Sequence, residues 1–326
     1  MTVKPVLIAT RALPTAVEAR ASRTYDYHAS PEAEPLSVSD LPAKARDLGA
    51  QALLVTPSDR MDADVIAALP DRIAIIATFS VGYEHIDLEA AEARGILVTN
   101  TPGVLTEATA DIALLLLLGA ARRASEGERM MRAGTWTGWT PTQLLGTDLR
   151  GKRLGILGMG RIGQALAHRA RALGMNILYH NRKPLPKEEA GDAQYQVRVE
   201  DLLFQSDALS LHVPATPQTR KFLNGARLAL LPRGAIVINT ARGAVVDDEA
   251  LIAALRHGQV GAAGLDVYDD EPKVHPGYAA LPNTFLLPHL GSATVETREA
   301  MGFKALDNLD AHFEGRIPPN RIHPTA

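Results

Sequence analysis

The stretch GILGMGRIG (155–163) constrains the fold of this chain more than any other feature. Apolar residues before Gly158 predict a short strand, and residues 164–173 predict a helix. Between them, Gly158 allows a tight turn, Gly160 lets a pyrophosphate approach the backbone, and Gly163 lets the helix pack on the sheet. The first N–H groups of such a helix favour phosphate. We therefore expect a dinucleotide at Gly158, Met159, Gly160, Arg161, Ile162 and Gly163; a purely structural glycine turn is the alternative.

Apolar runs alternate with helical patterns on both sides of this motif. Predicted strands before it are 6–10, 52–55, 73–78 and 96–99, and predicted strands from it onward are 154–157, 177–180, 208–212, 235–239, 263–266 and 285–287. Helices are expected between them, including one at 41–48 capped by Ser39, and a long one at 295–313 follows. Such alternation predicts a parallel α/β architecture, and the second series predicts a doubly wound nucleotide-binding sheet.

Length and composition limit the class of protein. The 326 residues suggest two domains. The net charge of −3, without any block of Lys and Arg, argues against nucleic acid or an anionic membrane as partner. Cysteine is absent, which excludes disulfides and thiolate chemistry. Residues 112–121 are strongly apolar but shorter than the ~20 residues that span a bilayer, so a buried helix or a subunit contact is expected. The N-terminus lacks the pattern of a signal peptide, and we expect a cytoplasmic protein.

Three polar residues follow predicted strands of the second series. Arg242, Glu271 and His289 come just after the strands 235–239, 263–266 and 285–287, at the edge where open α/β sheets bind ligands. A guanidinium binds a carboxylate in a bidentate fork, a histidine gives or takes a proton, and a neighbouring carboxylate favours the charged imidazole. These groups suit hydride transfer to a 2-keto acid. Their spacing matches no metal-ligand pattern, and a structural histidine is the alternative.

Both tryptophans of the chain, Trp136 and Trp139, lie in an irregular stretch between Gly134 and Gly151. Aromatic residues of this kind are frequent in contact surfaces. A core anchor is the other interpretation, and the sequence does not decide between them.

The chain resembles the D-isomer-specific 2-hydroxyacid dehydrogenases and, within them, the glyoxylate/hydroxypyruvate reductases. Seven stretches carry the resemblance, and they follow one another in the order found in that family. They are FSVGYEHID (79–87), NTPGVLTEATAD (100–111), GILGMGRIG (155–163), LHVPATPQT (211–219), INTARG (238–243), GLDVYDDEP (264–272) and LLPHLGSAT (286–294). The resemblance implies two Rossmann-like or flavodoxin-like domains with parallel sheets. A cofactor domain, residues 102–288, would be inserted into a discontinuous substrate domain, residues 1–101 and 289–326. It also implies a homodimer.

The resemblance assigns roles to single residues. Arg242 would bind the substrate carboxylate, His289 would be the acid/base, and Glu271 would orient it. Further substrate contacts would be Ser80, Val81, Gly82 and, reaching a neighbouring subunit, Trp139. Further cofactor contacts would be Thr106, Val213, Pro214, Thr240, Ala241, Asp266 at the nicotinamide carboxamide, and Gly291. A strand-end cap at Asp266 and an ordinary turn glycine at Gly82 are the alternatives.

The end of the predicted strand 177–180 indicates which dinucleotide binds. An NAD enzyme normally places Asp or Glu there, about 20 residues after the glycine motif, to bind the ribose 2′-OH. Here Asn181, Arg182 and Lys183 follow, and the first carboxylate is Glu188. Basic side chains attract a 2′-phosphate, so we expect NADP(H) to be preferred over NAD(H). A solvated basic turn with mixed cofactor use is the alternative.

The expected reactions are reduction of glyoxylate to glycolate and of hydroxypyruvate to D-glycerate. A 2-keto-gluconate reductase or another D-2-hydroxyacid dehydrogenase is the alternative enzyme. An NAD(H)-sensing protein resembling the transcriptional corepressors of this fold is the alternative outside catalysis.

Overall fold

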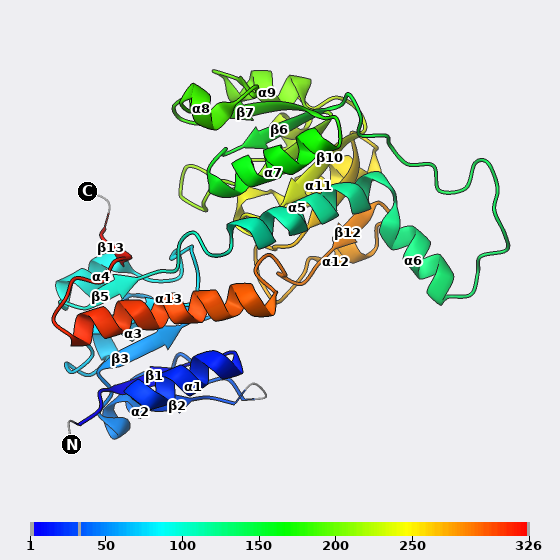
Figure 1. Cartoon of the computed structure of the whole chain (residues 1–326). Coiled ribbons are helices and arrows are strands. Elements are labelled where there is room, and N and C mark those ends of the chain that lie inside the picture. Colours follow the sequence, from blue (N-terminus) through cyan, green and yellow to red (C-terminus); the bar gives the residue numbers. More distant parts are fainter. Residues whose placement is uncertain (1–2, 32–33, 325–326) are drawn as a thin grey trace. The chain divides into compact units, whose positions relative to one another are not determined.

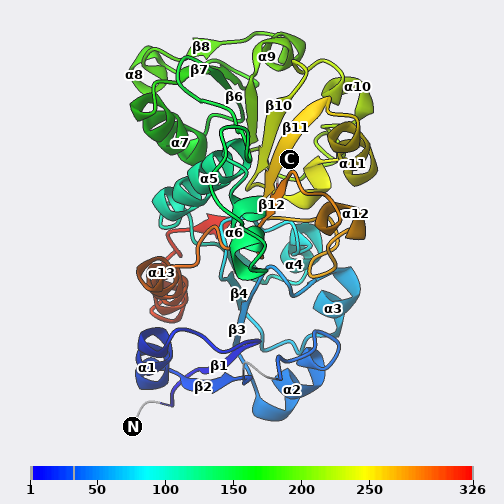
Figure 2. The ribbon, with the colours of Figure 1, turned by 90° about the vertical axis from the view of Figure 1, so that its right-hand side faces the viewer.

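The computed structural model describes residues 3–31 and 34–324. The chain forms two compact units, each with its own sheet (Figures 1 and 2). Unit 1 comprises Met1–Leu105 with Thr294–Ala326, and unit 2 comprises Thr106–Ala293. The predicted fold class is therefore confirmed, including the insertion of one domain into the other. His289, which the expected boundaries place in the substrate domain, lies in unit 2.

Unit 1 is a sheet covered by helices on both faces. Its strands are β1 (Val6–Ala9), β2 (Asp26–Ala29), β3 (Ala52–Val55), β4 (Ile75–Thr78), β5 (Leu97–Thr99) and β13 (Arg321–Ile322), in the order β13-β5-β4-β3-β1-β2. The strands β1 to β5 are parallel in the flavodoxin-like order, and only β13 pairs antiparallel. The helices α1 (Thr15–Thr24) and α13 (Val295–Phe313) bury one face, and α2 (Leu41–Leu48), α3 (Ala63–Ala68) and α4 (Leu88–Ala93) bury the other.

Unit 2 has the strand order of the classical dinucleotide-binding sheet. Its strands are β6 (Arg153–Leu157), β7 (Asn176–His180), β8 (Gln194–Tyr195), β9 (Ala208–Leu211), β10 (Ala235–Asn239), β11 (Val260–Leu265) and β12 (Thr284–Leu286). All pair in parallel in the order β12-β11-β10-β9-β6-β7-β8. The chain reverses its direction of winding between β6 and β9. That switch point is where such sheets bind ligands.

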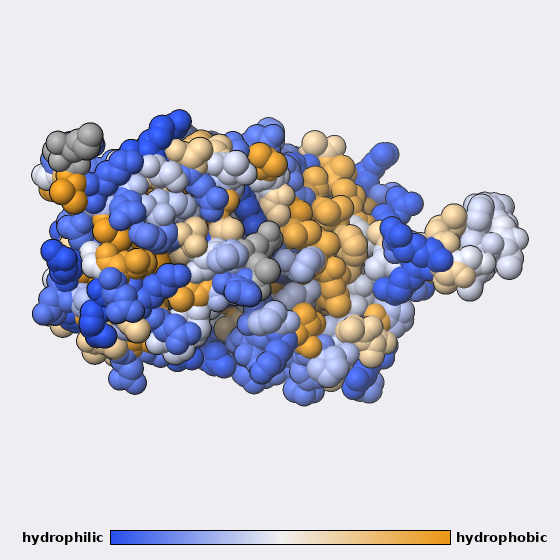
Figure 3. All heavy atoms as spheres, turned by 90° about the horizontal axis from the view of Figure 1, so that it is seen from below, coloured by the Kyte–Doolittle hydropathy of each residue, from blue (hydrophilic) through white to orange (hydrophobic). Residues whose placement is uncertain are grey.

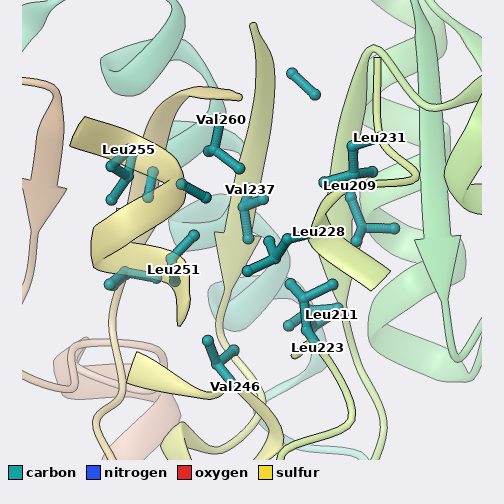
Figure 4. Packing of buried hydrophobic residues seen from close by; sticks show 14 of the residues in the cluster. Leu209, Leu211, Leu223, Leu228, Leu231, Val237, Val246, Leu251, Leu255 and Val260 are labelled. Atoms are coloured by element: carbon teal, nitrogen blue, oxygen red, sulfur yellow. The ribbon is translucent and has the colours of Figure 1, made fainter. Parts of the chain in front are cut away.

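Helices also cover both faces of the unit 2 sheet. α5 (Thr106–Ala121) and α7 (Arg161–Ala172) pack on one face, and α9 (Val199–Gln205), α10 (Gly225–Leu228) and α11 (Asp248–Arg256) pack on the other. In Figure 4, which shows the second layer, Leu251 and Leu255 of α11 lie on one side of Val237 and Leu209 lies on the other, and all four belong to one buried cluster. Each such side chain contributes about 1.5–3 kcal/mol on burial. This core holds the carboxyl ends of the strands in place beneath the site.

The structure corrects several expectations about single elements. The short strands β2, β8 and β13 and the helices α6 (Ala124–Arg132), α8 (Lys187–Ala190) and α12 (Pro276–Ala279) are additional to the predicted set. They are too short or too polar for apolar periodicity to reveal. Ser39 does not cap α2: the cap position is Asp40, which makes no side-chain capping bond, and Ser39 Oγ lies 2.7 Å from Ser37 Oγ. The apolar helix α5 is largely buried, although Leu115 remains 45% exposed.

The segment after α5 stands apart from the core of unit 2. None of the nine residues of α6 is buried, and the chain from Thr135 to Gly146 forms neither helix nor strand (Figure 1). Trp136 is 48% and Trp139 79% exposed, so the core-anchor interpretation is wrong. In Figure 3 this segment projects from unit 2, and an apolar area of the surface lies near the place where the segment leaves the unit. Among the helices of residues 3–31 and 34–324, no helix is long and apolar enough to cross a bilayer.

Candidate active site

The glycine turn between β6 and α7 has the expected geometry at all three glycines. Gly158 has φ +92°, and a Cβ there would lie 2.8 Å from the carbonyl oxygen of His212. A Cβ on Gly163 would lie 2.8 Å from the carbonyl oxygen of Gly158, so the helix packs closely on the turn. At Gly160, in contrast, a Cβ would meet no protein atom within 4 Å. Only Gly160 therefore leaves open space above the first N–H groups of α7, which have no partner within the helix.

The end of β7 is tied to this turn by Asn181. The N–H of Met159 donates to Asn181 Oδ1 at 2.7 Å, and the Tyr195 hydroxyl donates to the carbonyl of Asn181 at 3.1 Å. Asn181 thus holds the glycine turn in place, a role that the sequence did not reveal. The next two residues, Arg182 and Lys183, are exposed, and neither forms an ion pair with any described residue. Two cations therefore stand beside the turn where an NAD enzyme carries a carboxylate.

Arg242 is placed by the loop that follows β10. Asn239 fixes this loop, because its Oδ1 accepts from the N–H of Ala241 at 2.9 Å and its Nδ2 donates to the carbonyl of Arg242 at 2.9 Å. The next residue must be glycine: a Cβ on Gly243 would lie 1.8 Å from the backbone of Tyr268. The loop after β10 therefore lies directly against the chain that follows β11. Arg242 also donates to the carbonyl of Ala241 at 2.7 Å.

Glu271 and His289 form a hydrogen-bonded pair. His289 Nδ1 lies 2.7 Å from Glu271 Oε2, while Glu271 Oε1 accepts from the N–H of Tyr268 at 2.9 Å. Burial acts to raise the pKa of Glu271, but the bond and charge of His289, the Tyr268 N–H and the charge of Arg242 outweigh it, so the pKa is lowered. Because Nδ1 faces the carboxylate, Nε2 is the nitrogen left to exchange a proton with a ligand.

Asp266 holds the backbone that carries His289. His289 has φ +55°, a left-handed conformation that is costly for a residue with a side chain. Three N–H groups stabilise it: that of His289 donates to the carbonyl of Asp266 at 2.9 Å, and those of Leu290 and Gly291 donate to the two carboxylate oxygens at 2.6 and 2.8 Å. These bonds explain why His289 belongs to unit 2. Burial raises the pKa of Asp266.

The strand-end role that the sequence left as an alternative for Asp266 is therefore present. Whether the same carboxylate contacts a nicotinamide carboxamide stays a prediction. Thr109 supports the same loop, since its hydroxyl donates to the carbonyl of Gly291 at 3.0 Å. Sequence reasoning missed Thr109, although it lies in one of the family-like stretches.

The remaining predicted cofactor contacts follow the same strand ends or begin α5. Thr240 has a buried hydroxyl that lacks a hydrogen-bond partner within the described ranges, beside the fixed loop of Asn239. This orphaned hydroxyl and the open space at Gly160 fit a bound dinucleotide. The other contacts lie in unit 2: Thr106 at the start of α5, Val213 and Pro214 after β9, Ala241 after β10, and Gly291, which the expected boundaries placed in the substrate domain, after β12.

The predicted substrate contacts Ser80, Val81 and Gly82 follow β4 at the carboxyl edge of unit 1. Ser80 is 5% exposed, and its hydroxyl donates to the carbonyl of Gly82 at 2.5 Å. The Ser80 side chain is therefore engaged within its own loop. The groups that this loop offers to a ligand are backbone N–H groups. Trp139 belongs to the irregular segment 135–146 of unit 2. This segment, which follows α6, projects away from the sheet of its own unit (Figure 1).

Residues 114–291 match the family described as D-isomer specific 2-hydroxyacid dehydrogenase, NAD binding domain. A protein named glycerate dehydrogenase from Hyphomicrobium methylovorum is 46% identical over 317 residues, covering 97% of this chain and 98% of that protein. A protein named glyoxylate reductase from Thermococcus litoralis is 46% identical over 328 residues, covering 98% of this chain and 97% of its own length.

Among solved structures, the NADPH-dependent glyoxylate/hydroxypyruvate reductase of Sinorhizobium meliloti, in complex with NADP and malonate, superposes with a TM-score of 0.86. The two chains are 35% identical, and the match covers 98% of this chain and 97% of that one. These similarities extend over both units. The chain belongs to the D-isomer specific 2-hydroxyacid dehydrogenase family.

Proposed function

We propose that this protein reduces small 2-keto acids, glyoxylate to glycolate and hydroxypyruvate to D-glycerate, with NADPH as the hydride donor. The observation that carries the proposal is the His289–Glu271 pair, with the Arg242 charge acting on the same carboxylate. All three side chains follow strands of a dinucleotide-binding sheet. The names of the relatives, glyoxylate reductase and glycerate dehydrogenase, support this class of substrate.

Each residue has a distinct part in the proposed reaction. A nicotinamide dinucleotide bound along the glycine turn supplies the hydride. The backbone N–H groups of Val81 and Gly82 bind the substrate carboxylate, and Arg242 binds it in a fork and polarises the adjacent carbonyl. His289 gives its Nε2 proton to the carbonyl oxygen as that oxygen gains negative charge. Glu271 holds the imidazole ring at Nδ1 and so leaves Nε2 as the nitrogen that gives the proton.

The preference for NADPH rests on the basic turn at the end of β7. Arg182 and Lys183 are exposed cations without an ion-pair partner in the described chain, and Asn181 replaces the usual carboxylate. A carboxylate there would repel a 2′-phosphate, whereas these cations attract it. The NADPH-dependent neighbour from Sinorhizobium meliloti supports this reading.

Steady-state kinetics with both cofactors tests the proposal. Glyoxylate, hydroxypyruvate and 2-keto-gluconate are offered with NADPH or NADH, and kcat/KM is expected to favour NADPH with one of the first two acids. R182E should shift the ratio toward NADH by about tenfold or more. A wild-type preference for NADH contradicts the cofactor proposal. Tight NADPH binding without turnover of any 2-keto acid favours a cofactor-sensing protein instead.

We further infer that a second copy of the chain covers the projecting segment, as the predicted homodimer requires. The helix α6 buries no residue, and Met131, Trp136, Trp139 and Leu145 are between 48% and 79% exposed. Sedimentation should give a dimer, and W139A should raise KM for the keto acid if Trp139 contributes to a neighbouring active site. A monomer at micromolar concentration contradicts this inference. The cytoplasmic location stays a prediction.

A further inference from the structure

The loop after β4 has three successive carbonyl groups that all accept hydrogen bonds from unit 1. The carbonyl of Ser80 accepts from the N–H of Thr101 at 2.9 Å, and that of Val81 accepts from Asn100 Nδ2 at 2.8 Å. The carbonyl of Gly82 accepts from the Ser80 hydroxyl at 2.5 Å. The orientation of three consecutive peptide planes is thereby fixed.

This arrangement determines where the N–H groups of the loop point. In a trans peptide the N–H is opposite the carbonyl, so the N–H groups of Val81, Gly82 and Tyr83 point away from the three donors. None of them has an acceptor in the described parts of the chain. Val81 and Gly82 are partly exposed and Tyr83 is 36% exposed. A row of such N–H groups is suited to bind a carboxylate.

Three side chains behind the loop form a chain of hydrogen bonds, and the donors and acceptors in it can be assigned in only one way. A carbonyl can only accept, so the single hydrogen of the Ser80 hydroxyl goes to Gly82. The Thr78 hydroxyl, 2.8 Å from Ser80 Oγ, must then donate to Ser80. Thr78 has no second hydrogen, so His85 Nε2, 2.9 Å away, must carry a hydrogen and donate it to Thr78. The chain therefore runs from His85 through Thr78 and Ser80 to the Gly82 carbonyl.

We propose that Thr78 and His85 are positioning residues for the substrate carboxylate. They fix the Ser80 hydroxyl, and this hydroxyl fixes the Gly82 carbonyl. The Tyr83 N–H is thereby turned outward, as a third donor beside the N–H groups of Val81 and Gly82. The inference rests on the proposed function, since it concerns the same carboxylate. Thr78 is 0% and Ser80 5% exposed. Water therefore cannot replace a missing member, and the Ser80 hydroxyl loses its partner when the chain is broken.

The direct test compares three variants of buried threonines in unit 1. T78V has nearly the shape of the wild type but lacks the hydroxyl, T78S keeps it, and T99V removes a buried hydroxyl that has no partner within the described residues. We expect T78V to raise KM for the keto acid about tenfold while KM for the cofactor stays within about twofold. T78S and T99V should behave like the wild type. A T78V enzyme with unchanged KM for the keto acid overturns the proposal, as does equal loss in T99V.

A second measurement does not depend on turnover. The ¹⁵N shifts of the histidine side chains report which ring nitrogen carries hydrogen, and H85Q identifies the signals of His85. We expect a protonated Nε2 in the wild type and loss of this preference in T78V. An Nε2 without hydrogen overturns the direction of the chain. If the wild type reduces none of the 2-keto acids, the proposed function fails, while the His85 signals still decide whether the chain exists.

Discussion

In the loop after β4, at the carboxyl edge of the unit 1 sheet, the groups offered to a ligand are backbone N–H groups, whereas after β10, β11 and β12, at the carboxyl edge of unit 2, they are charged side chains. Val81, Gly82 and Tyr83 contribute their backbone N–H groups, and neutral hydroxyl and amide groups hold these peptides in place. In unit 2 carboxylates hold the site: Glu271 holds the His289 ring, and Asp266 holds its backbone.

The difference follows from what each set of groups does in the proposed reaction. A substrate carboxylate is charged throughout the reaction, so groups with a fixed orientation, such as these N–H dipoles, can contribute to binding it. The carbonyl oxygen gains negative charge only during the reaction, so it needs a group that can give it a proton at that moment. Changes at the edge of unit 2 should therefore lower kcat, whereas changes at the edge of unit 1 should raise KM for the keto acid.

H289Q should have the largest effect, because it removes the proton donor itself. We expect kcat to fall about 10³-fold with little change in the dissociation constant of NADPH. The matched control is H275Q, which alters another His–Glu pair of unit 2, with His275 Nε2 3.0 Å from Glu249, and should keep wild-type kcat. H289Q with undiminished kcat would remove His289 from the proposed mechanism and make the two edges alike.

R242K should have the next largest effect. Lysine keeps the positive charge but lacks the planar fork that binds a carboxylate through two hydrogen bonds. We expect kcat/KM for the keto acid to fall about 100-fold, with both constants changed, because the same group binds and polarises the substrate. R220K, in an exposed pair with Asp269, serves as control. A change in KM alone would place Arg242 with the unit 1 groups, as a residue that only binds.

Sequence reasoning recovered the two edges unequally, for a physical reason. Arg242, Glu271 and His289 were identified from their chemistry and their position after strands, whereas the residue types in Ser80–Gly82 carry no such signal and needed the resemblance to a family. Glu271 was also identified as the group that orients His289, but several uncharged groups that fix the two edges were missed. Asn239, Thr109, Asn100 and Thr78 act through hydrogen bonds whose partners become visible only when the chain is folded.

The fold was more accessible, because apolar strands and the glycine motif specify it locally. The long apolar strands of both sheets were predicted, while β8 and β13, of two residues each, lack enough residues for a periodic pattern. Short paired segments depend on neighbours that are distant in sequence. The same holds for the function of Asn181, which joins β7 to the glycine turn.

Variants of the glycine turn should have smaller effects. They test a place in unit 2 where backbone groups, rather than charged side chains, bind the ligand. G160A places a methyl group in space that contains no protein atom within 4 Å, so the fold should tolerate it while NADPH binds about tenfold more weakly. G163A places a methyl group 2.8 Å from the Gly158 carbonyl and should lower Tm. Calorimetric titration with NADPH and thermal unfolding without it separate the two effects. Equal loss of Tm in both variants would make the turn purely structural.

The smallest expected effect is that of E271Q on the stability of the fold in acid. The pKa of Glu271 is lowered in the folded protein, so the ionised carboxylate contributes stability above its unfolded pKa, and this contribution is lost as pH falls through the folded value. Because Glu271 is 35% and His289 41% exposed, the contribution at neutral pH should be below about 1 kcal/mol. E271Q should therefore show a shallower fall of Tm than the wild type from about pH 5 downward.

E249Q, whose carboxylate in the other pair is 80% exposed, should follow the wild-type curve. If both glutamine variants follow that curve, the Glu271 carboxylate positions His289 without a net electrostatic contribution to folding, and the edge of unit 2 depends on geometry alone, as that of unit 1 does.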